Sequence, residues 1–277
     1  MFTLNCKGRI LVINEPIVMG IMNTTPDSFF AGSRFNQTDD VLVKAETMIR
    51  EGAVILDLGG QSTRPGSLPV TEDEEKARVL PAIEAISRNF PDQVISIDSF
   101  FSGVVKEAIA AGASIVNDVS AGSLDEKLLD VVAAEKVPYV LMHMRGNPQN
   151  MQKETEYKNV SLEVFDSLNK KLRELNHKGI KDVIIDPGFG FAKTIEQNFT
   201  LLRQLNFFKA LERPLMVGLS RKSTIYKTLN ISAEEALNGS TVLHTIALLN
   251  GATILRVHDV KPAVEAIKLV NACQKKE

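Results

Sequence analysis

The chain has 277 residues, and its 44% hydrophobic content is sufficient for a sizeable core. With 32 basic and 34 acidic residues the net charge is −2, which excludes a broad surface for nucleic acid or another polyanion. Two cysteines near opposite ends, no signal-peptide core and no apolar stretch of membrane-spanning length indicate a cytoplasmic protein without membrane contact.

The first predicted element is a β-hairpin over residues 2–13, which turns at Lys7 and Gly8. A hairpin that precedes the first strand of a barrel can plug the barrel's N-terminal end. We therefore expect this hairpin to have a structural role.

After the hairpin, one pattern recurs eight times: a short apolar run that resembles a β-strand ends at a residue able to bind a ligand or react. The runs cover residues 17–22, 54–56, 94–97, 115–116, 137–142, 183–185, 215–219 and 254–257, and they end at Asn23, Asp57, Asp98, Asn117, His143, Asp186, Ser220 and His258. Asp and Asn after a strand are often helix caps, but capping alone does not explain eight such positions. We predict an α/β fold, a (β/α)8 TIM barrel that forms a single domain over residues 1–277, with its active site at the C-terminal strand ends.

Periodicity and end signals delimit most of the connecting helices. They are predicted over residues 39–51, 102–111, 160–177, 222–229, 233–249 and 261–274, and Thr71 to Glu74 form a capping box that opens another. The loops over residues 23–36 and 59–69 are too long and polar to be simple connections. We expect these two loops to serve the active site.

Three side chains at the ends of the third, fourth and sixth strands would face one cavity: Asp98, Asn117 and Asp186. A carboxylate accepts hydrogen bonds, and a carboxamide both donates and accepts. A flat heterocycle with a guanidine-like edge, such as a pterin or guanine, is their natural complement. A metal site or a proton-shuttling pair of carboxylates is the alternative.

A second set of side chains is cationic and consists of Arg64, Arg221, Lys222, Arg256 and His258. The region after the seventh and eighth strands of such barrels frequently binds phosphate. Arg256 and His258 alternate on one strand and therefore face the same side. Arg221 could instead be a solvated surface charge. Together the two sets predict a substrate with a heterocycle at one end and a phosphate or diphosphate at the other.

The sixth strand ends in the turn Asp-Pro-Gly-Phe-Gly-Phe, residues 186–191. Its two glycines would let the backbone approach a ligand closely, and its phenylalanines could form a stacking wall. His177 and His244 fall within helices, where a packing or surface role is the simplest interpretation.

These motifs resemble those of one family, the dihydropteroate synthases of folate biosynthesis. The matching segments span nearly the whole chain and are residues 19–29, 57–66, 96–99, 117–119, 142–144, 186–191, 220–223 and 256–260. Three departures from the family pattern are present: Gln61 stands where Glu is frequent, Ala192 stands where Gly is usual, and the first loop reads Phe-Ala-Gly-Ser at residues 30–33 in place of an acidic, Gly-rich continuation. None of the three removes a proposed ligand.

The resemblance implies that 6-hydroxymethyl-7,8-dihydropterin diphosphate and p-aminobenzoate condense to 7,8-dihydropteroate and pyrophosphate, with Mg²⁺ assisting. It implies pterin contacts from Asp98, Asn117, Met142, Asp186 and Lys222, diphosphate contacts from Asn23, Thr63, Arg256 and His258, and p-aminobenzoate contacts from Arg64, Pro65, Phe191, Ser220 and Lys222. Asn23 would also bind Mg²⁺, and the catalytic residues would be Asp98, Asp186, Lys222, Arg256 and His258. The family further suggests a homodimer that forms through the last helices, and inhibition by sulfonamides.

Three other functions compete with this interpretation. A methyltetrahydrofolate-dependent methyltransferase would share the pterin-binding set but has no use for the loop at residues 63–66 or for a diphosphate site. A non-catalytic pterin-binding paralogue would be expected to have lost parts of the loops or the Arg256 and His258 pair. A Schiff-base aldolase would use Lys222, but an apolar pocket signature is missing around it.

Overall fold

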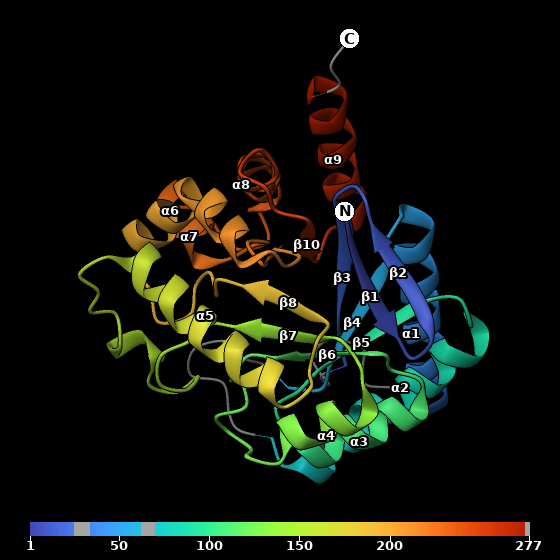
Figure 1. The fold of residues 1–277 in the computed structure, drawn as a ribbon. Helices are drawn as coiled ribbons and strands as arrows, with labels where there is room; N and C mark the ends of the chain where they lie inside the picture. Colours follow the sequence, from blue (N-terminus) through green and yellow to red (C-terminus); the bar gives the residue numbers. More distant parts are fainter. Residues whose placement is uncertain (25–33, 62–69, 275–277) are drawn as a thin grey trace.

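The computed structural model describes residues 1–24, 34–61 and 70–274, with only the backbone of residues 34–38. Eight parallel strands form one sheet in the order β8-β7-β6-β5-β4-β3-β10-β9. They are β3 (Ile17–Asn23), β4 (Ile55–Gly59), β5 (Val94–Asp98), β6 (Ile115–Asp118), β7 (Tyr139–Met142), β8 (Val183–Asp186), β9 (Met216–Val217) and β10 (Ile254–Val257). A parallel bridge between Ile185 and Leu215 joins the two ends of the sheet, so the strands close into the predicted (β/α)8 barrel (Figure 1).

Helices follow the strands and surround the barrel (Figure 1). They are α1 (Arg34–Glu51), α2 (Glu72–Asn89), α3 (Ser102–Ala111), α4 (Leu128–Glu135), α5 (Val160–His177), α6 (Ile195–Arg203), α7 (Ser223–Leu229), α8 (Leu237–Leu249) and α9 (Val260–Gln274), with 3₁₀ turns at Met151–Lys153 and Leu205–Leu211. The predicted bounds of α3 and α5 are confirmed, and so is the capping box of α2, where the Thr71 hydroxyl accepts from the Glu74 N–H at 3.3 Å. Helix α8 begins later than predicted, because Ser232 and Glu235 form a separate hydrogen-bonded turn before it.

The N-terminal hairpin plugs one end of the barrel, as predicted. β1 (Phe2–Cys6) pairs antiparallel with β2 (Arg9–Ile13), and the backbone turns through positive φ angles at Lys7 and Gly8. Inward-facing strand residues pack against the hairpin in one buried cluster, which we call the apolar layer: Leu4, Cys6, Ile13, Ile17, Met19, Ile55, Val94, Ile115, Val140, Ile184, Met216 and Ile254. Burial of this layer holds the N-terminal ends of all eight strands together.

The outward-facing strand residues pack beneath the helices in a second buried cluster. Leu56 and Leu58 of β4, for example, are buried in this cluster with Ile83 of α2. The strands are therefore covered on both faces, as a parallel sheet requires. In the described parts of the chain, no helix is long and apolar enough to cross a membrane.

Candidate active site

Polar side chains occupy the inward positions that follow the apolar layer toward the C-terminal strand ends. We call them the polar layer: Asp57 of β4, Asp98 of β5, Asn117 of β6, Asp186 of β8 and Arg256 of β10. Asp98 pairs with Asn117 in the register of β5 and β6, and Met142 pairs with Asp186 in the register of β7 and β8. The strand pattern therefore brings these side chains to the same end of the barrel, as the sequence predicts.

Arg256 lies between two carboxylates of the polar layer. Its guanidinium donates to Asp57 Oδ2 at 2.6 Å and to Asp98 Oδ2 at 2.5 Å. Asp57 Oδ2 also accepts from the Asn117 carboxamide at 3.0 Å. The acceptor set and the cationic set, which the residue pattern separates, are therefore joined by ion pairs in this structure.

Asp57 also belongs to this site, although the sequence pattern did not single it out as a ligand. It is fully buried, and it holds both Arg256 and Asn117. Its position at the end of a strand-like run is the same signal that singles out Asp98 and Asp186. A buried carboxylate with two donors on one oxygen orients its partners, so Asp57 fixes the floor of the site.

Burial dominates the electrostatics of the remaining charges. It raises the pKa of Asp186, an effect that nearby Lys222 and Arg256 oppose. It lowers the pKa of Lys222 to about 8, an effect that Asp186 opposes. Charges removed from water are tolerated when they compensate one another: Arg256 forms ion pairs with Asp57 and Asp98, and Lys222 interacts electrostatically with Asp186.

Lys222 precedes α7 and reaches across to the turn at residues 186–191. Its ammonium donates to the Phe189 carbonyl and lies 4.7 Å from the centre of the Phe191 ring. A Cβ atom at Gly190 would lie 3.2 Å from the Lys222 side chain, and Gly190 has a φ of +81°, so this close approach favours glycine. Lys222 stands among charged groups, Asp186, Asp98 and Arg256, and not in the apolar pocket of a Schiff-base lysine, which disfavours the aldolase alternative.

The turn itself folds tightly against the neighbouring strand. Asp186 Oδ1 accepts from the Gly188 N–H at 2.8 Å, and a Cβ at Gly188 would lie 2.0 Å from the His143 carbonyl oxygen. Ala192, where the family pattern has Gly, is buried and has a φ of +51°. Side chains rarely adopt this left-handed conformation, so the surrounding contacts must hold the backbone there.

Ser220 and His258 lie side by side after β9 and β10. Ser220 Oγ lies 3.0 Å from His258 Nδ1 and accepts from the His258 N–H at 3.2 Å. Arg221 does not join them, because its guanidinium binds Asp259 in a bidentate pair at 2.8 and 2.9 Å and also donates to the Glu234 carbonyl. Arg221 is therefore ion-paired in this structure and is not a freely solvated charge, and its role as a phosphate ligand stays a prediction.

The remaining candidates lie around the mouth or outside the described residues. Asn23, at the end of β3, is partly exposed, and Met142 is buried at the end of β7. Among the described residues no three His, Cys, Asp or Glu side chains are grouped to hold a metal ion. Thr63, Arg64 and Pro65, together with most of the two long loops, lie outside the described residues.

Comparisons with known proteins agree with this geometry. Residues 19–258 match the model of the family described as pterin binding enzyme. The chain is 42% identical to the dihydropteroate synthase of Escherichia coli strain K12 over 269 residues, which cover 96% of this chain and 94% of that one. It also resembles the solved dihydropteroate synthases of Yersinia pestis, in a sulfonamide drug complex, and Xanthomonas albilineans, with 4-aminobenzoic acid. Each is 38% identical, with a TM-score of 0.92 and 99% of both chains covered.

Proposed function

The chain belongs to the pterin-binding enzyme family, and we infer that it is a transferase of folate biosynthesis with dihydropteroate synthase activity. It condenses 6-hydroxymethyl-7,8-dihydropterin diphosphate with p-aminobenzoate and releases pyrophosphate. The observation that carries this function is the polar layer, in which the partly buried Asp98 and the buried Asn117 and Asp186 lie at one mouth of the barrel. These acceptors complement the N–H edge of a pterin.

The pterin is bound through that edge. Asp98, Asn117 and Asp186 accept its hydrogen bonds, Met142 lies against the ring, and Lys222 donates to it. Because Arg256 already binds Asp98 at 2.5 Å, the incoming pterin must share this carboxylate with the guanidinium or displace it. Displacement would free Arg256 to turn toward the diphosphate.

The chemical step needs no protein nucleophile. The bond between the pterin methylene carbon and the diphosphate oxygen breaks, and the diphosphate leaves with the electron pair. The amine nitrogen of p-aminobenzoate then forms the new C–N bond and loses a proton. Asp98 and Asp186 stabilise the developing cation electrostatically, while Arg256 and His258 bind the leaving group.

Mg²⁺ is proposed to accompany the diphosphate. Mg²⁺ keeps several water ligands and usually takes only one or two ligands from the protein beside substrate phosphates. The described residues fit this mode, since they form no metal-binding cluster of their own and place the Asn23 carboxamide at the partly exposed mouth. When bound, the ion would neutralise charge on the leaving diphosphate, which Thr63 would also contact.

The p-aminobenzoate pocket is proposed to form above the turn at residues 186–191. Phe191, Ser220 and Lys222 would supply its described wall, and Arg64 and Pro65 the rest. Lys222 lies over the Phe191 ring, which gives the pocket an apolar face beside a cation. A sulfonamide that mimics p-aminobenzoate would occupy the same place.

One assay separates the candidate functions. The protein is incubated with the dihydropterin diphosphate, Mg²⁺ and p-aminobenzoate, and pyrophosphate and 7,8-dihydropteroate are quantified. We expect pyrophosphate release that depends on p-aminobenzoate. Binding of the diphosphate without product would support the non-catalytic paralogue, and demethylation of methyltetrahydrofolate would support the methyltransferase.

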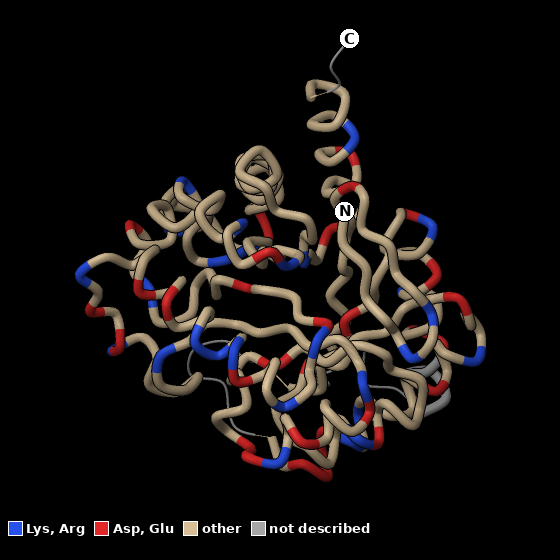
Figure 2. The backbone as a smooth tube through the Cα atoms, in the orientation of Figure 1, with Lys and Arg blue, Asp and Glu red and all other residues tan. Residues whose placement is uncertain are grey.

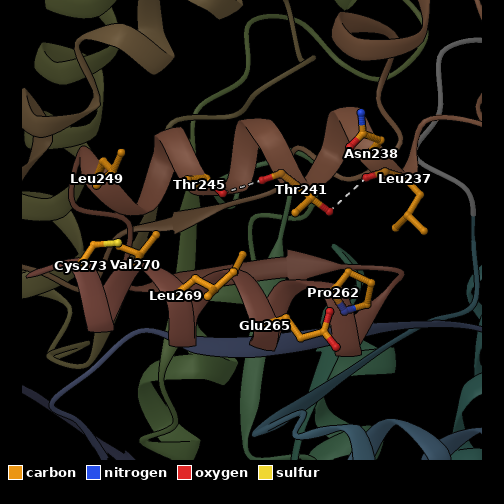
Figure 3. Close-up of a pocket in the computed structure, with 11 residues that line it drawn as sticks. Leu237, Asn238, Thr241, Thr245, Leu249, Pro262, Glu265, Leu269, Val270 and Cys273 are labelled. Atoms are coloured by element: carbon orange, nitrogen blue, oxygen red, sulfur yellow. Dashed lines mark hydrogen bonds between the residues drawn. The ribbon is translucent and has the colours of Figure 1, made fainter.

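The protein is proposed to form a homodimer through α8 and α9. Helix α8 carries no charged residue, and Figure 2 shows it without blue or red. A groove of about 610 Å³ runs between the two helices, lined largely by apolar side chains such as Leu237, Leu249 and Leu269 (Figure 3). Exposed apolar surface of this kind marks an association site, and the same largely apolar face on a second copy, with Glu265 of α9 at its side, can pack against it in a two-fold dimer.

The oligomer is tested by light scattering coupled to gel filtration. Leu269 is 69% exposed, so Leu269→Glu leaves the fold intact and should convert the dimer to a monomer. Leu162→Glu, at an exposed position of α5, is the matched control and should stay dimeric. A monomeric wild-type protein would contradict the proposal.

We also propose that the protein works in the cytoplasm. Cys6 is buried, Cys273 is exposed, and both are free thiols. An exposed free thiol is typical of a reducing compartment.

A further inference from the structure

A buried lysine that the mechanism does not use lies beneath the turn at residues 186–191. Lys193 is 4% exposed, and its ammonium lies 2.9 Å from the Gly188 carbonyl oxygen, 3.0 Å from the Phe191 carbonyl oxygen and 3.1 Å from His143 Nδ1. An ammonium has three donors and no acceptor. Its three hydrogens therefore have three partners, two of them in the turn.

His143 completes this arrangement as an acceptor. It follows β7, is 4% exposed, and lies at the end of one of the eight strand-like runs. Burial, together with Lys193 and Arg145, lowers the pKa of His143 to about 2. The ring is therefore neutral, and the nearby ammonium favours the tautomer whose Nδ1 lone pair faces Lys193.

Most peptide groups of the turn at residues 186–191 form hydrogen bonds. Lys193 binds the carbonyls of Gly188 and Phe191, Lys222 binds that of Phe189, and Asn198 accepts from the Gly190 N–H at 2.8 Å. Two groups of the proposed site stand at its ends, Asp186 for the pterin and Phe191 for p-aminobenzoate. The left-handed backbone at Ala192 shows that the chain adopts an unfavourable conformation there, which these bonds must maintain.

We propose that Lys193 is a positioning residue for the transfer reaction, whose ammonium fixes the turn between the two substrates and supports the negative charge of Asp186. This proposal rests on the proposed function. Lys193 touches neither substrate and acts through Asp186 and Phe191. A displacement of about 1 Å in such groups can cost on the order of a hundredfold in rate.

The charges around the pair determine the expected pH dependence. Burial raises the pKa of Asp186, and Lys222, Arg256 and Lys193 all lower it. Burial lowers the pKa of Lys193 to about 7. The negative charge of Asp186 opposes this shift, and the positive charges of Lys222 and Arg145 add to it. Because the carboxylate form of Asp186 is the active one, removal of the positive charge at residue 193 raises the pKa of Asp186. The acid limb of kcat/KM then moves to higher pH.

Lys193→Met tests the proposal, since it keeps the length of the side chain and removes its charge and donors. We expect kcat/KM to fall by roughly ten- to a hundredfold, with the acid limb shifted to higher pH. Lys193→Arg retains the charge and should restore the position of the acid limb. Lys178→Met removes an ion-paired surface lysine and is the matched control, expected to behave as wild type.

The outcomes separate this proposal from the proposed function. If the wild-type protein makes no dihydropteroate, the function fails. If wild type is active and folded Lys193→Met has the wild-type acid limb and kcat/KM, the positioning role is overturned. His143→Leu provides a second test that holds even if Lys193→Met does not fold. This variant removes the acceptor of one Lys193 N–H but keeps the positive charge. The kcat should therefore fall, while the acid limb of the pH profile stays at the wild-type position. Unchanged kcat in this variant would overturn the proposal.

Discussion

The polar layer of the barrel is built on strands that also carry the apolar layer, one inward position further along β4, β6, β8 and β10 and two positions further along β5. On β8 the inward residue changes from Ile184 to Asp186, and on β4 from Ile55 to Asp57. The apolar layer is buried, and in the polar layer Asp57, Asn117 and Asp186 are buried while Asp98 and Arg256 are partly buried. One layer removes hydrocarbon from water, and the other removes charge from water. The difference shows that burial of apolar side chains stabilises the N-terminal end of the barrel, whereas desolvation of the charged side chains needed for catalysis destabilises the C-terminal end.

The largest expected effect is on stability and comes from the apolar layer. Ile184→Ala removes a fully buried side chain beneath the hairpin and should lower the free energy of unfolding by about 2–5 kcal/mol. The kcat of the folded variant should stay near wild type, because the polar layer is unchanged. Urea unfolding and steady-state assays check this, and a large loss of kcat in the folded variant would break the separation of the layers.

The next effect is on catalysis and comes from the polar layer. Asp186→Asn removes the charge that holds the pterin edge and should cost about 2–4 kcal/mol in kcat/KM, a loss of tens- to several hundredfold. Its unfolding should remain cooperative, since the carboxamide keeps the hydrogen bond to the Gly188 N–H. A variant with wild-type pterin affinity and turnover would remove Asp186 from the site.

A smaller effect distinguishes the two residues proposed to bind the diphosphate. His258→Ala should weaken inorganic pyrophosphate binding by about 1–3 kcal/mol and leave the affinity for a pterin without phosphates almost unchanged. Arg256→Ala should alter both affinities, because Arg256 also neutralises Asp57 and Asp98. Calorimetry with the two ligands measures this. Normal pyrophosphate binding with lost turnover in His258→Ala would indicate a general base instead.

The smallest effect lies at the edge of the polar layer, where Gln61 differs from the family pattern. Its carboxamide donates to Glu75 at 3.2 Å, and Glu75 is fully buried. Burial raises the pKa of Glu75 from its ordinary 4.5 to about 7, so the folded state binds the proton more tightly. The stability that this proton contributes is present below pH 4.5 and is lost as the pH rises toward 7.

Gln61→Glu sharpens this dependence, because two adjacent carboxyl groups cannot both ionise readily. We expect little change in unfolding free energy near pH 5 and a loss of about 1–2 kcal/mol at pH 8. Urea titrations at both pH values, with Gln61→Ala as control, provide the measurement. An equal loss at both pH values would show that the carboxyl pair does not form.

Features that depend on local pattern were predictable from the sequence. The hairpin, the strand ends and the bounds of α3 follow from turn residues, apolar runs and a terminal glycine. The gathering of Asp98, Asn117 and Asp186 follows from parallel topology, because equivalent strand ends meet at one edge of a barrel.

Pairings between distant segments were not predictable in the same way. Arg256 and Asp57 are 199 residues apart, and no periodicity records that they touch. Arg221 and Asp259 are 38 residues apart, and their ion pair was likewise not visible in any local pattern. Lys193 follows a glycine-rich turn and precedes a helix, a context in which an exposed lysine is expected. Its burial results from the way the turn packs on His143.

The closure of the barrel also has a consequence for synthesis on the ribosome. β10 pairs with β3, which joins Ile254 near the end of the chain to Ile17 near its start. The hairpin is made before the barrel strands, but the surface on which it packs is complete only after β10 has emerged. Contacts of such long sequence separation form slowly, and an unfinished chain exposes its strand edges. We therefore expect nascent chains that stop before β10 to depend on chaperones, and the barrel to close once β10 has emerged.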